Sequence, residues 1–327
     1  MGKMFTIDRK KYLILPHFKF IGNKIIFLDK YKYFVANKNS TLNYAGKIDF
    51  LLNEGVIIRK RAKKKIGKRG GHKILVIEPH PDDFALSASG FVLNKKYRDV
   101  KVLNIFSKTL AVNFPWGNKF LIDEDDFETM RIRESEIAIK QYFGLNFESL
   151  RLPLAQKRGH RNNFCRQKIK SEGALIKVLS QKFTNEIKRH NYDILLCPLG
   201  VQNHIDHIVA FEACILAYKK ISKQNNKFKL IFYEEYPYAR NKKSLFERLK
   251  YLNTFLKLEK TFVDVSNHLQ TINNAIMIYR TQFDDINSEQ MLNLIEKDFQ
   301  VVFSEEITPD KNEPRLLQRY YKLEKIL

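Results

Sequence analysis

Apolar and polar residues along this chain form two kinds of segment that follow one another. Short apolar runs rich in β-branched residues, typical of buried strands, are followed by longer segments whose apolar residues recur at helical spacing. Strands joined through helices form parallel sheets with helices on both faces. The pattern therefore predicts an α/β fold with a Rossmann-like, mainly parallel sheet. The predicted strands span residues 73–77, 100–106, 149–152, 193–197 and 228–233, and the predicted helices span residues 83–95, 128–143, 174–188 and 208–220.

Residues 1–58 differ from this pattern and predict a small N-terminal α+β unit. Apolar runs at residues 24–29 and 31–36 predict a hairpin, and residues 41–54 predict a helix that ends at a glycine. A hairpin and one helix are too small to bury a core of their own. We expect this unit to dock on the main domain or on a partner. A basic linker at residues 59–71 then leads into the main domain, residues 72–327.

A polar string follows the first predicted strand of the main domain. His80, Asp82 and Asp83 come directly after the apolar run at residues 74–77. Open α/β sheets bind ligands at the carboxyl ends of their strands, because the strand-to-helix loops converge there. Two neighbouring carboxylates repel each other unless a cation or a proton separates them. The string therefore indicates a binding site, where a metal ion would relieve the repulsion.

A second polar string, which contains His204, Asp206 and His207, follows the predicted strand at residues 193–197. If a helix begins at Asp206 and His207, the imidazoles of His204 and His207 can approach one point. Two imidazoles and one carboxylate suit zinc, and a catalytic zinc keeps a fourth position for water. Each string alone also fits an ordinary role, such as a helix N-cap or polar residues on the surface. Both strings at the same end of one sheet favour a divalent metal site.

At these residues the chain resembles the LmbE-like, or PIG-L, family of zinc-dependent N-acetylglucosaminyl deacetylases. That family carries Ala/Pro-His-Pro-Asp-Asp-Glu after its first strand and His-x-Asp-His much later, and this chain has both with one change. The resemblance covers roughly residues 72 to 290. Further matches in the family's order are Gly90, Arg131, Glu134, Ala138, Gly144 and the closing segments at residues 263–266 and 275–282.

The resemblance implies which residues hold the metal. His80, Asp83 and His207 would be the ligands of one zinc ion per chain, and Asp82 would be the general base that takes a proton from water. Hydrolysis of an amide at neutral pH needs a hydroxide equivalent, and zinc supplies one by lowering the pKa of bound water to about 7. The expected reaction is removal of the N-acetyl group from a GlcNAc-type residue of a glycoconjugate, a glycolipid or a sugar metabolite.

The resemblance also assigns residues to the substrate. His204 would polarise the amide oxygen or protonate the leaving amine, Asp206 would hold the His204 ring in the useful tautomer, and Arg131 would contact sugar hydroxyls. Losing one donor to a developing oxyanion typically costs about 10²–10³-fold in rate. A further segment, residues 233–240, follows the fifth predicted strand. Its aromatic residues and arginine border the cleft or belong to an ordinary turn.

The chain departs from the family pattern at two places. Phe84 stands where the family has a Glu after the double Asp, which removes a carboxylate that could support the metal site or its loop. Residues 151–158 stand where the family often has an Asp that contacts substrate. We therefore expect substrate recognition to have diverged.

The composition bounds the possible partners. The chain has 327 residues, of which 44% are hydrophobic, which is enough for a packed core and excludes a disordered protein. Its net charge of +22 is concentrated in part at residues 59–71. That run is either a solvated linker or a contact with an anionic partner, such as a membrane surface that carries a lipid-linked saccharide, a phosphorylated glycan or nucleic acid. We expect an N-acetylated sugar, anionic or lipid-linked, as substrate.

Two alternatives to this function remain. One keeps the metal and changes the scissile acyl group, which makes the chain an amidohydrolase for another N-acyl substrate. The other is a basic nucleic-acid-binding protein on a degenerate hydrolase fold, against which the complete set of His and Asp residues argues.

The cysteines and the N-terminus bear on location. The three cysteines include no Cys-x-x-Cys pair, which favours free thiols in a reducing compartment. We find no N-terminal apolar stretch of the length of a signal peptide or a membrane span. We expect a cytoplasmic protein with peripheral membrane contact through the basic linker.

Overall fold

Seven strands form one mixed sheet in the order β11-β12-β10-β9-β6-β7-β8. The structure is a computed structural model that describes residues 71–94, 97–108, 124–160, 162–283 and 316–327, together with the backbone of short strands between residues 12 and 59. The strands of the large sheet are β6 (His72–Glu78), β7 (Tyr97–Lys108), β8 (Asn146–Pro153), β9 (Ile194–Pro198), β10 (Lys229–Tyr233), β11 (Leu256–Asp264) and β12 (Leu317–Ile326).

The five predicted strands form the parallel part of this sheet. β8, β7, β6, β9 and β10 are parallel neighbours, whereas β12 is antiparallel to both β10 and β11. The prediction of a mainly parallel α/β sheet is confirmed. The sequence pattern did not predict β11 and β12. Charged residues interrupt β12, so that this segment lacks the apolar run by which the buried strands were found.

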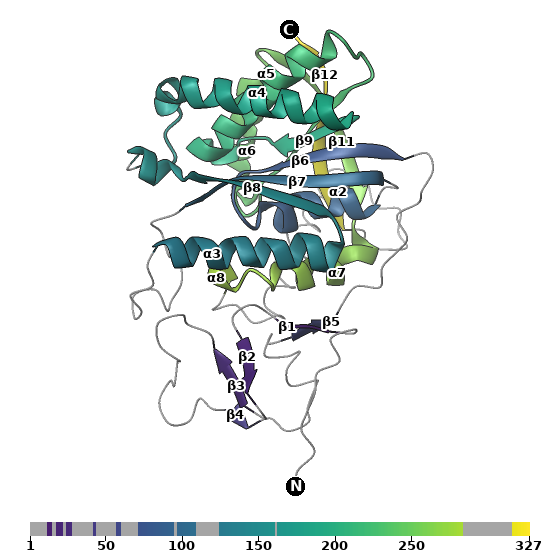
Figure 1. Ribbon diagram of the computed structural model, residues 1–327. Helices are drawn as coiled ribbons and strands as arrows, with labels where there is room; N and C mark the ends of the chain where they lie inside the picture. Colours follow the sequence, from purple (N-terminus) through teal and green to yellow (C-terminus); the bar gives the residue numbers. More distant parts are fainter. Residues whose placement is uncertain are drawn as a thin grey trace.

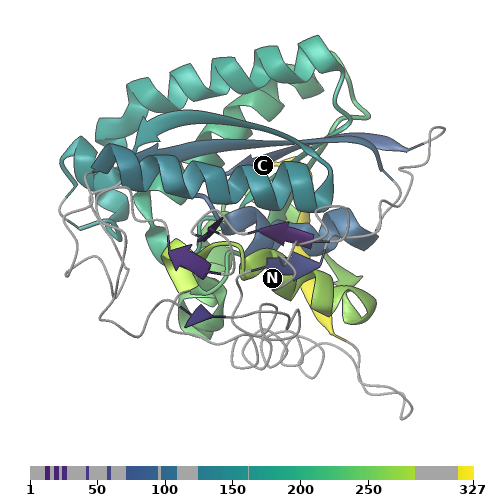
Figure 2. The same cartoon turned by 60° about the horizontal axis from the view of Figure 1, so that its bottom comes forward.

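Helices cover both faces of the sheet (Figures 1 and 2). Side chains alternate between the two faces of a strand, and β6 shows this directly. Ile74 and Val76 pack in the core with α2 and α7, while Leu75 and Ile77 pack in the core with α4, α5 and α6. The helices are α2 (Ser89–Asn94), α3 (Glu124–Ser135), α4 (Gly173–His190), α5 (Ile205–Ser222), α6 (Lys242–Leu252), α7 (Leu269–Ile276) and α8 (Arg280–Phe283), with π-helical segments at Phe84–Ala88 and Glu136–Phe143.

Strand β12 explains the glycine at position 90. A Cβ atom on Gly90 would lie 2.0 Å from Oε1 of Gln318 in β12 and 2.7 Å from a methyl group of Val265. Only a residue without a side chain fits between α2 and these neighbours. Gly90 therefore allows the helix after β6 to pack closely on the C-terminal strand.

The N-terminal strands differ in part from the prediction. β2 (Phe18–Ile21), β3 (Lys24–Phe27) and β4 (Leu42–Asn43) form an antiparallel sheet, and β1 (Tyr12–Ile14) pairs with β5 (Ile57–Arg59). The predicted strand at residues 24–29 is confirmed over residues 24–27, but its hairpin partner is β2.

Two other N-terminal predictions fail or lie outside the described residues. Leu42–Asn43 form a strand, so the helix predicted for residues 41–54 is wrong at its start because pairing with β3 outweighs the local helical spacing. The rest of that segment, the predicted strand at residues 31–36 and most of the basic linker lie outside the described residues. The two-residue sequence Gly-Asn between β2 and β3 is itself a hairpin signal.

The cysteines are free, as predicted, and Cys197 and Cys214 are buried. Among the helices of the described residues, none combines the length and the apolar character needed to cross a bilayer.

Candidate active site

The first polar string forms a tight loop at the carboxyl end of β6. The Asp83 carboxylate accepts a hydrogen bond from the backbone N–H of His80 at 2.8 Å, and the backbone N–H of Asp83 donates to the His80 carbonyl at 3.2 Å. Asp82 between them has a φ of 115°, a conformation that is strained for a residue with a Cβ atom. The hydrogen bonds around Asp83 thus hold Asp82 in a conformation that it would otherwise avoid.

The second polar string lies at the start of α5, as the prediction required. The helix begins at Ile205, so His204 is its N-cap and His207 lies in its first turn. β9, which precedes this loop, pairs with β6, and the two loops meet at one edge of the sheet. One ring nitrogen from each of His80, His204 and His207 lies within 4.8 Å of the other two.

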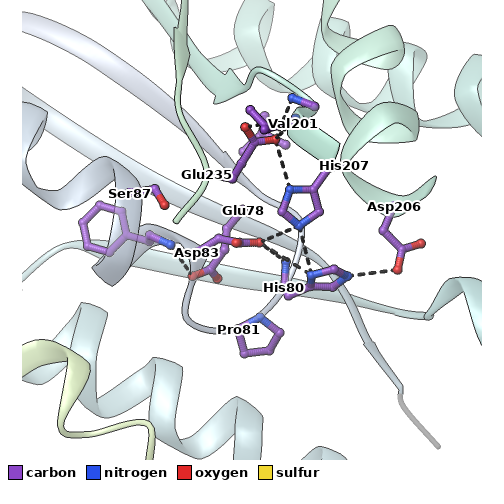
Figure 3. Close-up of polar contacts among 12 residues, drawn as sticks. Glu78, His80, Pro81, Asp83, Ser87, Val201, Asp206, His207 and Glu235 are labelled. Atoms are coloured by element: carbon purple, nitrogen blue, oxygen red, sulfur yellow. Dashed lines mark hydrogen bonds and ion pairs between the residues drawn. The ribbon is translucent and has the colours of Figure 1, made fainter. Parts of the chain in front are cut away.

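The three predicted ligands, His80, Asp83 and His207, each contribute one atom to a compact triangle (Figure 3). Nδ1 of His80 lies 3.1 Å from Nε2 of His207. Oδ2 of Asp83 lies 3.7 Å from the former nitrogen and 3.5 Å from the latter. Ligands bound to zinc at about 2.0–2.1 Å in a tetrahedral site are about 3.3 Å apart. The triangle of His80, Asp83 and His207 therefore has the size of a zinc site.

Two buried carboxylates fix the orientation of the histidine rings (Figure 3). Nε2 of His80 lies 2.9 Å from Asp206, and Nδ1 of His207 lies 3.1 Å from Glu235. An ionised carboxylate only accepts, so each ring presents its N–H to the carboxylate and its lone pair to the other ring. In neutral rings, two lone pairs facing each other at 3.1 Å repel. A metal cation or a proton between them removes the repulsion, so the donor set fits a metal ion.

Electrostatics at His207 support the same conclusion. Burial alone would lower the pKa of His207, but the negative charges of Asp83 and Glu235 raise it to about 9. The protein thus stabilises a positive charge at the point where the predicted metal ligands converge. Without a metal, a proton on His207 supplies that charge.

The position of Asp206 corrects one prediction. We expected Asp206 to hold the ring of His204, but its carboxylate contacts His80, the backbone N–H of Ala155 at 3.2 Å and Nη2 of Arg158 at 2.8 Å. Burial opposes its ionisation, yet the hydrogen bond with His80 and the nearby positive charges hold its pKa below its usual range. The direction in which its side chain leaves the first turn of α5 decides this contact, and the sequence spacing does not reveal it.

A buried ionic chain extends from Asp206 away from the metal site. Arg158 lies between Asp206 and Glu172, with its Nε 3.1 Å from Oε1 of Glu172. Glu172 also contacts the ring of His160, and Arg158 lies 4.7 Å from the ring centre of Phe106. Arg158 belongs to the segment in which we expected divergence. The structure shows that this segment supports His80 through Asp206.

The general base predicted at Asp82 lies beside the triangle. Burial and the charge of Asp83 raise its pKa well above the usual value, and the guanidinium of Arg131 opposes this rise. A dication at the adjacent site would also favour the ionised form. Arg131 is buried and donates from Nη2 to the carbonyl of Pro81 at 3.0 Å. The contact it shows is with the loop that carries Asp82, and its contact with substrate stays a prediction.

His204 differs from the other two histidines because Nδ1 is buried without a hydrogen-bond partner among the described residues. Its ring packs edge-on against Phe164 at 5.1 Å between ring centres and lies 6.0 Å from Tyr238. Burial, followed by the charges of His80 and His207, lowers its pKa well below the usual value. A neutral imidazole with an unused nitrogen remains available for a substrate group.

Comparison with known families identifies the domain. The sequence model of the PIG-L family, described as GlcNAc-PI de-N-acetylase, matches residues 75–218, which include both polar strings. Residues 75–218 form a PIG-L domain. The resemblance seen in the sequence is thereby confirmed. No protein in a search of curated proteins matches the chain.

Solved structures agree on the fold of the PIG-L domain. The pseudoaglycone deacetylase Dbv21 superposes with a TM-score of 0.55 at 19% identity, covering 79% of this chain and 99% of its own. A deacetylase of the teicoplanin biosynthesis pathway gives 0.58 at 15% identity, covering 77% and 97%. GalB, the 4-carboxy-2-hydroxymuconate hydratase from Pseudomonas putida, gives 0.52 at 14% identity, covering 77% and 95%. Because a hydratase shares this fold, the function must be argued from the site residues.

A buried carboxylate lies near Phe84, although position 84 itself carries none. The Phe84 side chain is fully buried and packs edge-on against Phe143, with 5.2 Å between ring centres. Glu78 at the end of β6 is also fully buried, and its Oε1 accepts a hydrogen bond from the backbone N–H of Phe84 at 3.1 Å. The family pattern has a carboxylate at position 84. In this chain Glu78, at the end of β6, supplies a carboxylate to the same loop.

Sequence reasoning missed Glu235, which follows β10 of the large sheet. Its carboxylate accepts from the backbone N–H groups of Gly200 at 2.6 Å and Val201 at 3.3 Å, and it also contacts His207. The signal available in the sequence was its place after a strand, because β10 is the parallel neighbour of β9. The predicted border segment at residues 233–240 therefore contributes to the site.

We expect Glu235→Gln to weaken binding of a divalent metal ion by about tenfold or more. Outer carboxylates raise the basicity of a ligand histidine, and their loss typically costs about 10–100-fold in metal affinity. Competition with a chromophoric chelator measures the affinity. Glu234→Gln is the matched control, because Glu234 is buried beside it but pairs with Arg319 and Tyr321. Equal affinities for the two variants would contradict the role of Glu235.

Proposed function

We propose that this chain is a zinc-dependent hydrolase that removes the N-acetyl group from a GlcNAc-type residue of a glycoconjugate, a glycolipid or a sugar metabolite. One observation carries the proposal. The lone pairs of His80 and His207 converge beside the Asp83 carboxylate, and each ring is held from behind by a buried carboxylate. The match to the PIG-L family supports the choice of acyl group and sugar.

His80, Asp83 and His207 would hold the zinc, which supplies Lewis acidity and lowers the pKa of a water molecule. Asp82 takes the proton of the attacking water, because it adjoins Asp83 and its carboxylate is the basic group there without a ligand role. His204 donates a hydrogen bond to the oxygen of the scissile amide, where negative charge develops. The proton taken by Asp82 then goes to the amine nitrogen, so that a neutral amine leaves.

Residues 1–58 form a small unit, residues 59–71 a basic linker and residues 72–327 the deacetylase domain. Each positive charge near an anionic lipid surface gains about 1 kcal/mol, so the linker would hold the enzyme at a membrane with a lipid-linked substrate. Three free thiols favour the cytoplasm.

Acetate release tests this proposal. The purified chain, with zinc restored after chelation, should release acetate from one or more members of a panel of GlcNAc conjugates, and the chelated protein should not. Bound zinc should approach one ion per chain. No acetate from any N-acetylated sugar after zinc is restored would overturn the proposal. Salt-sensitive RNA binding that survives chelation would then favour the basic binding protein.

A further inference from the structure

A pocket of about 380 Å³ lies beside the candidate active site, and none of the roles above uses it. Phe164 and Asn203 line the side of the pocket nearest to His204. Phe164 is the aromatic residue whose ring contacts the His204 ring, and Asn203 precedes His204 in the chain. A group held in this pocket therefore lies next to the residue that faces the scissile amide.

Arg248 on α6 brings a buried positive charge to this pocket. The side chain is buried, with 4% exposure, and its Nε donates to the carbonyl of Leu199 at 2.8 Å. Both terminal nitrogens are buried without a hydrogen-bond partner among the described residues. Buried N–H groups of a cation are costly when they lack acceptors. Since Arg248 lines the pocket, the missing acceptors can come from a ligand there.

A second guanidinium lines the same pocket. Arg166, two residues after Phe164, lies over the ring of Tyr251 with its central carbon 3.1 Å from the ring centre. Stacking fixes the plane of the guanidinium and leaves its N–H groups at the edge. Two arginines thus converge on one pocket.

Among the described residues, no carboxylate accepts a hydrogen bond from the terminal nitrogens of Arg248. Burial and, to a lesser extent, the charge of Arg166 lower the pKa of Arg248 to about 10, while Glu235 and Glu212 oppose this shift. Glu235 already accepts hydrogen bonds from two backbone N–H groups and contacts His207. Glu247 lines the pocket but is exposed to solvent.

The Arg248 guanidinium packs closely against the backbone at Gly200. A Cβ atom on Gly200 would lie 2.7 Å from Nη2 of Arg248, and Gly200 has a φ of +84°. A glycine is required on both counts, because it removes the clash and adopts the left-handed conformation without strain. The Phe211 ring packs against the guanidinium, whose central carbon lies 4.5 Å from the ring centre.

We propose that this pocket binds an oxyanion of the acetylated substrate, a phosphate or a carboxylate group carried by the sugar or its aglycone. Guanidinium groups match the oxygens of both anions through paired, charge-assisted hydrogen bonds. The inference rests on the proposed function for the acetyl group and adds the substrate class. It makes the enzyme selective for anionic over neutral N-acetylated sugars.

Substrate selectivity is the first test. GlcNAc 6-phosphate, N-acetylmuramic acid and GlcNAc carry the same acetamido group with a phosphate, a carboxylate and no charge. We expect kcat/KM to favour one of the two anionic sugars over GlcNAc, and the better of them identifies the anion. Arg166→Gln should lower that preference by about tenfold or more. Arg133→Gln on α3 is the control, because it removes an exposed arginine far from the pocket.

Phosphate binding is a second readout that needs no turnover. Calorimetric titration of the full chain with inorganic phosphate should show binding that Arg166→Gln weakens by about tenfold and Arg133→Gln leaves unchanged. Arg248→Gln should act in the same direction, and the half-buried Arg166 keeps the test valid if that variant does not fold. Phosphate binding lost in His207→Ala but kept in Arg166→Gln would place the anion on the metal ligands and overturn the proposal.

The two proposals fail in different ways. If neutral and anionic sugars are deacetylated equally by the wild-type chain, the oxyanion pocket is wrong and the deacetylase function stands. If no sugar releases acetate but phosphate binding depends on Arg166, the deacetylase function is wrong and the pocket remains an anion site.

Discussion

Asp82→Asn is expected to lower kcat for acetate release by about 10³-fold while the chain keeps its fold and its metal. General base catalysis contributes about 10²–10⁴-fold, and an amide cannot accept the proton of water. Asparagine has nearly the same shape as aspartate and tolerates the positive φ of this position better than most residues do. The loss should therefore be one of chemistry.

Steady-state kinetics with the best sugar of the panel, together with zinc content and a thermal melt, checks this expectation. The melting temperature and the zinc stoichiometry should match the wild-type values. An Asp82→Asn enzyme that retains more than a tenth of the wild-type kcat would remove Asp82 from the base role. The proton acceptor would then have to be another group at the site.

Arg158→Met should destabilise the fold by about 3 kcal/mol or more at pH 7. Removal of one partner from a buried ionic network leaves the others uncompensated, which typically costs about 3–5 kcal/mol. Here Asp206 and Glu172 both lose a guanidinium. Methionine fills much of the same volume, so a cavity contributes little.

Urea unfolding in the presence of a chelator measures this loss without a contribution from metal binding. Arg133→Met is the control, because its exposed ion pair with Glu136 should contribute less than about 1 kcal/mol. The folded-state pKa of Asp206 is lowered, so its stabilising contribution is present above the unfolded pKa of about 3.9 and is lost as the pH falls below it. The difference between wild type and Arg158→Met should therefore narrow below about pH 4. Equal unfolding free energies at pH 7 would contradict the ionic chain.

The sequence predicted the parallel strands, the loops at their carboxyl ends and the convergence of the histidines. These features follow from local patterns, because an apolar run that ends in polar residues determines both the strand and the edge at which its loop lies. The triangle of His80, Asp83 and His207 has the predicted members. Their role as metal ligands stays a prediction.

The supporting residues could not be predicted in the same way. Glu235 and Arg158 act through partners that are distant in the sequence, and the choice of partner depends on where a side chain leaves its helix or strand. Asp206 shows this most clearly, because only one residue separates it from His204 but its carboxylate contacts His80. The helix predicted for residues 41–54 is wrong at its start for a related reason, since a strand pairing replaced the local helical preference at Leu42.

The position of β12 has a consequence for folding on the ribosome. β12 lies between β10 and β11, and its Tyr320 hydroxyl accepts a hydrogen bond from the backbone N–H of Phe91 and lies 3.2 Å from the Ser87 carbonyl. The helix that follows the first polar string is therefore held by a residue, Tyr320, that is synthesised 229 residues after Phe91. Until then the edge of β10 is unpaired, which is the state in which strands aggregate. A nascent chain of this protein therefore depends on protection of that edge until residues 317–326 are available.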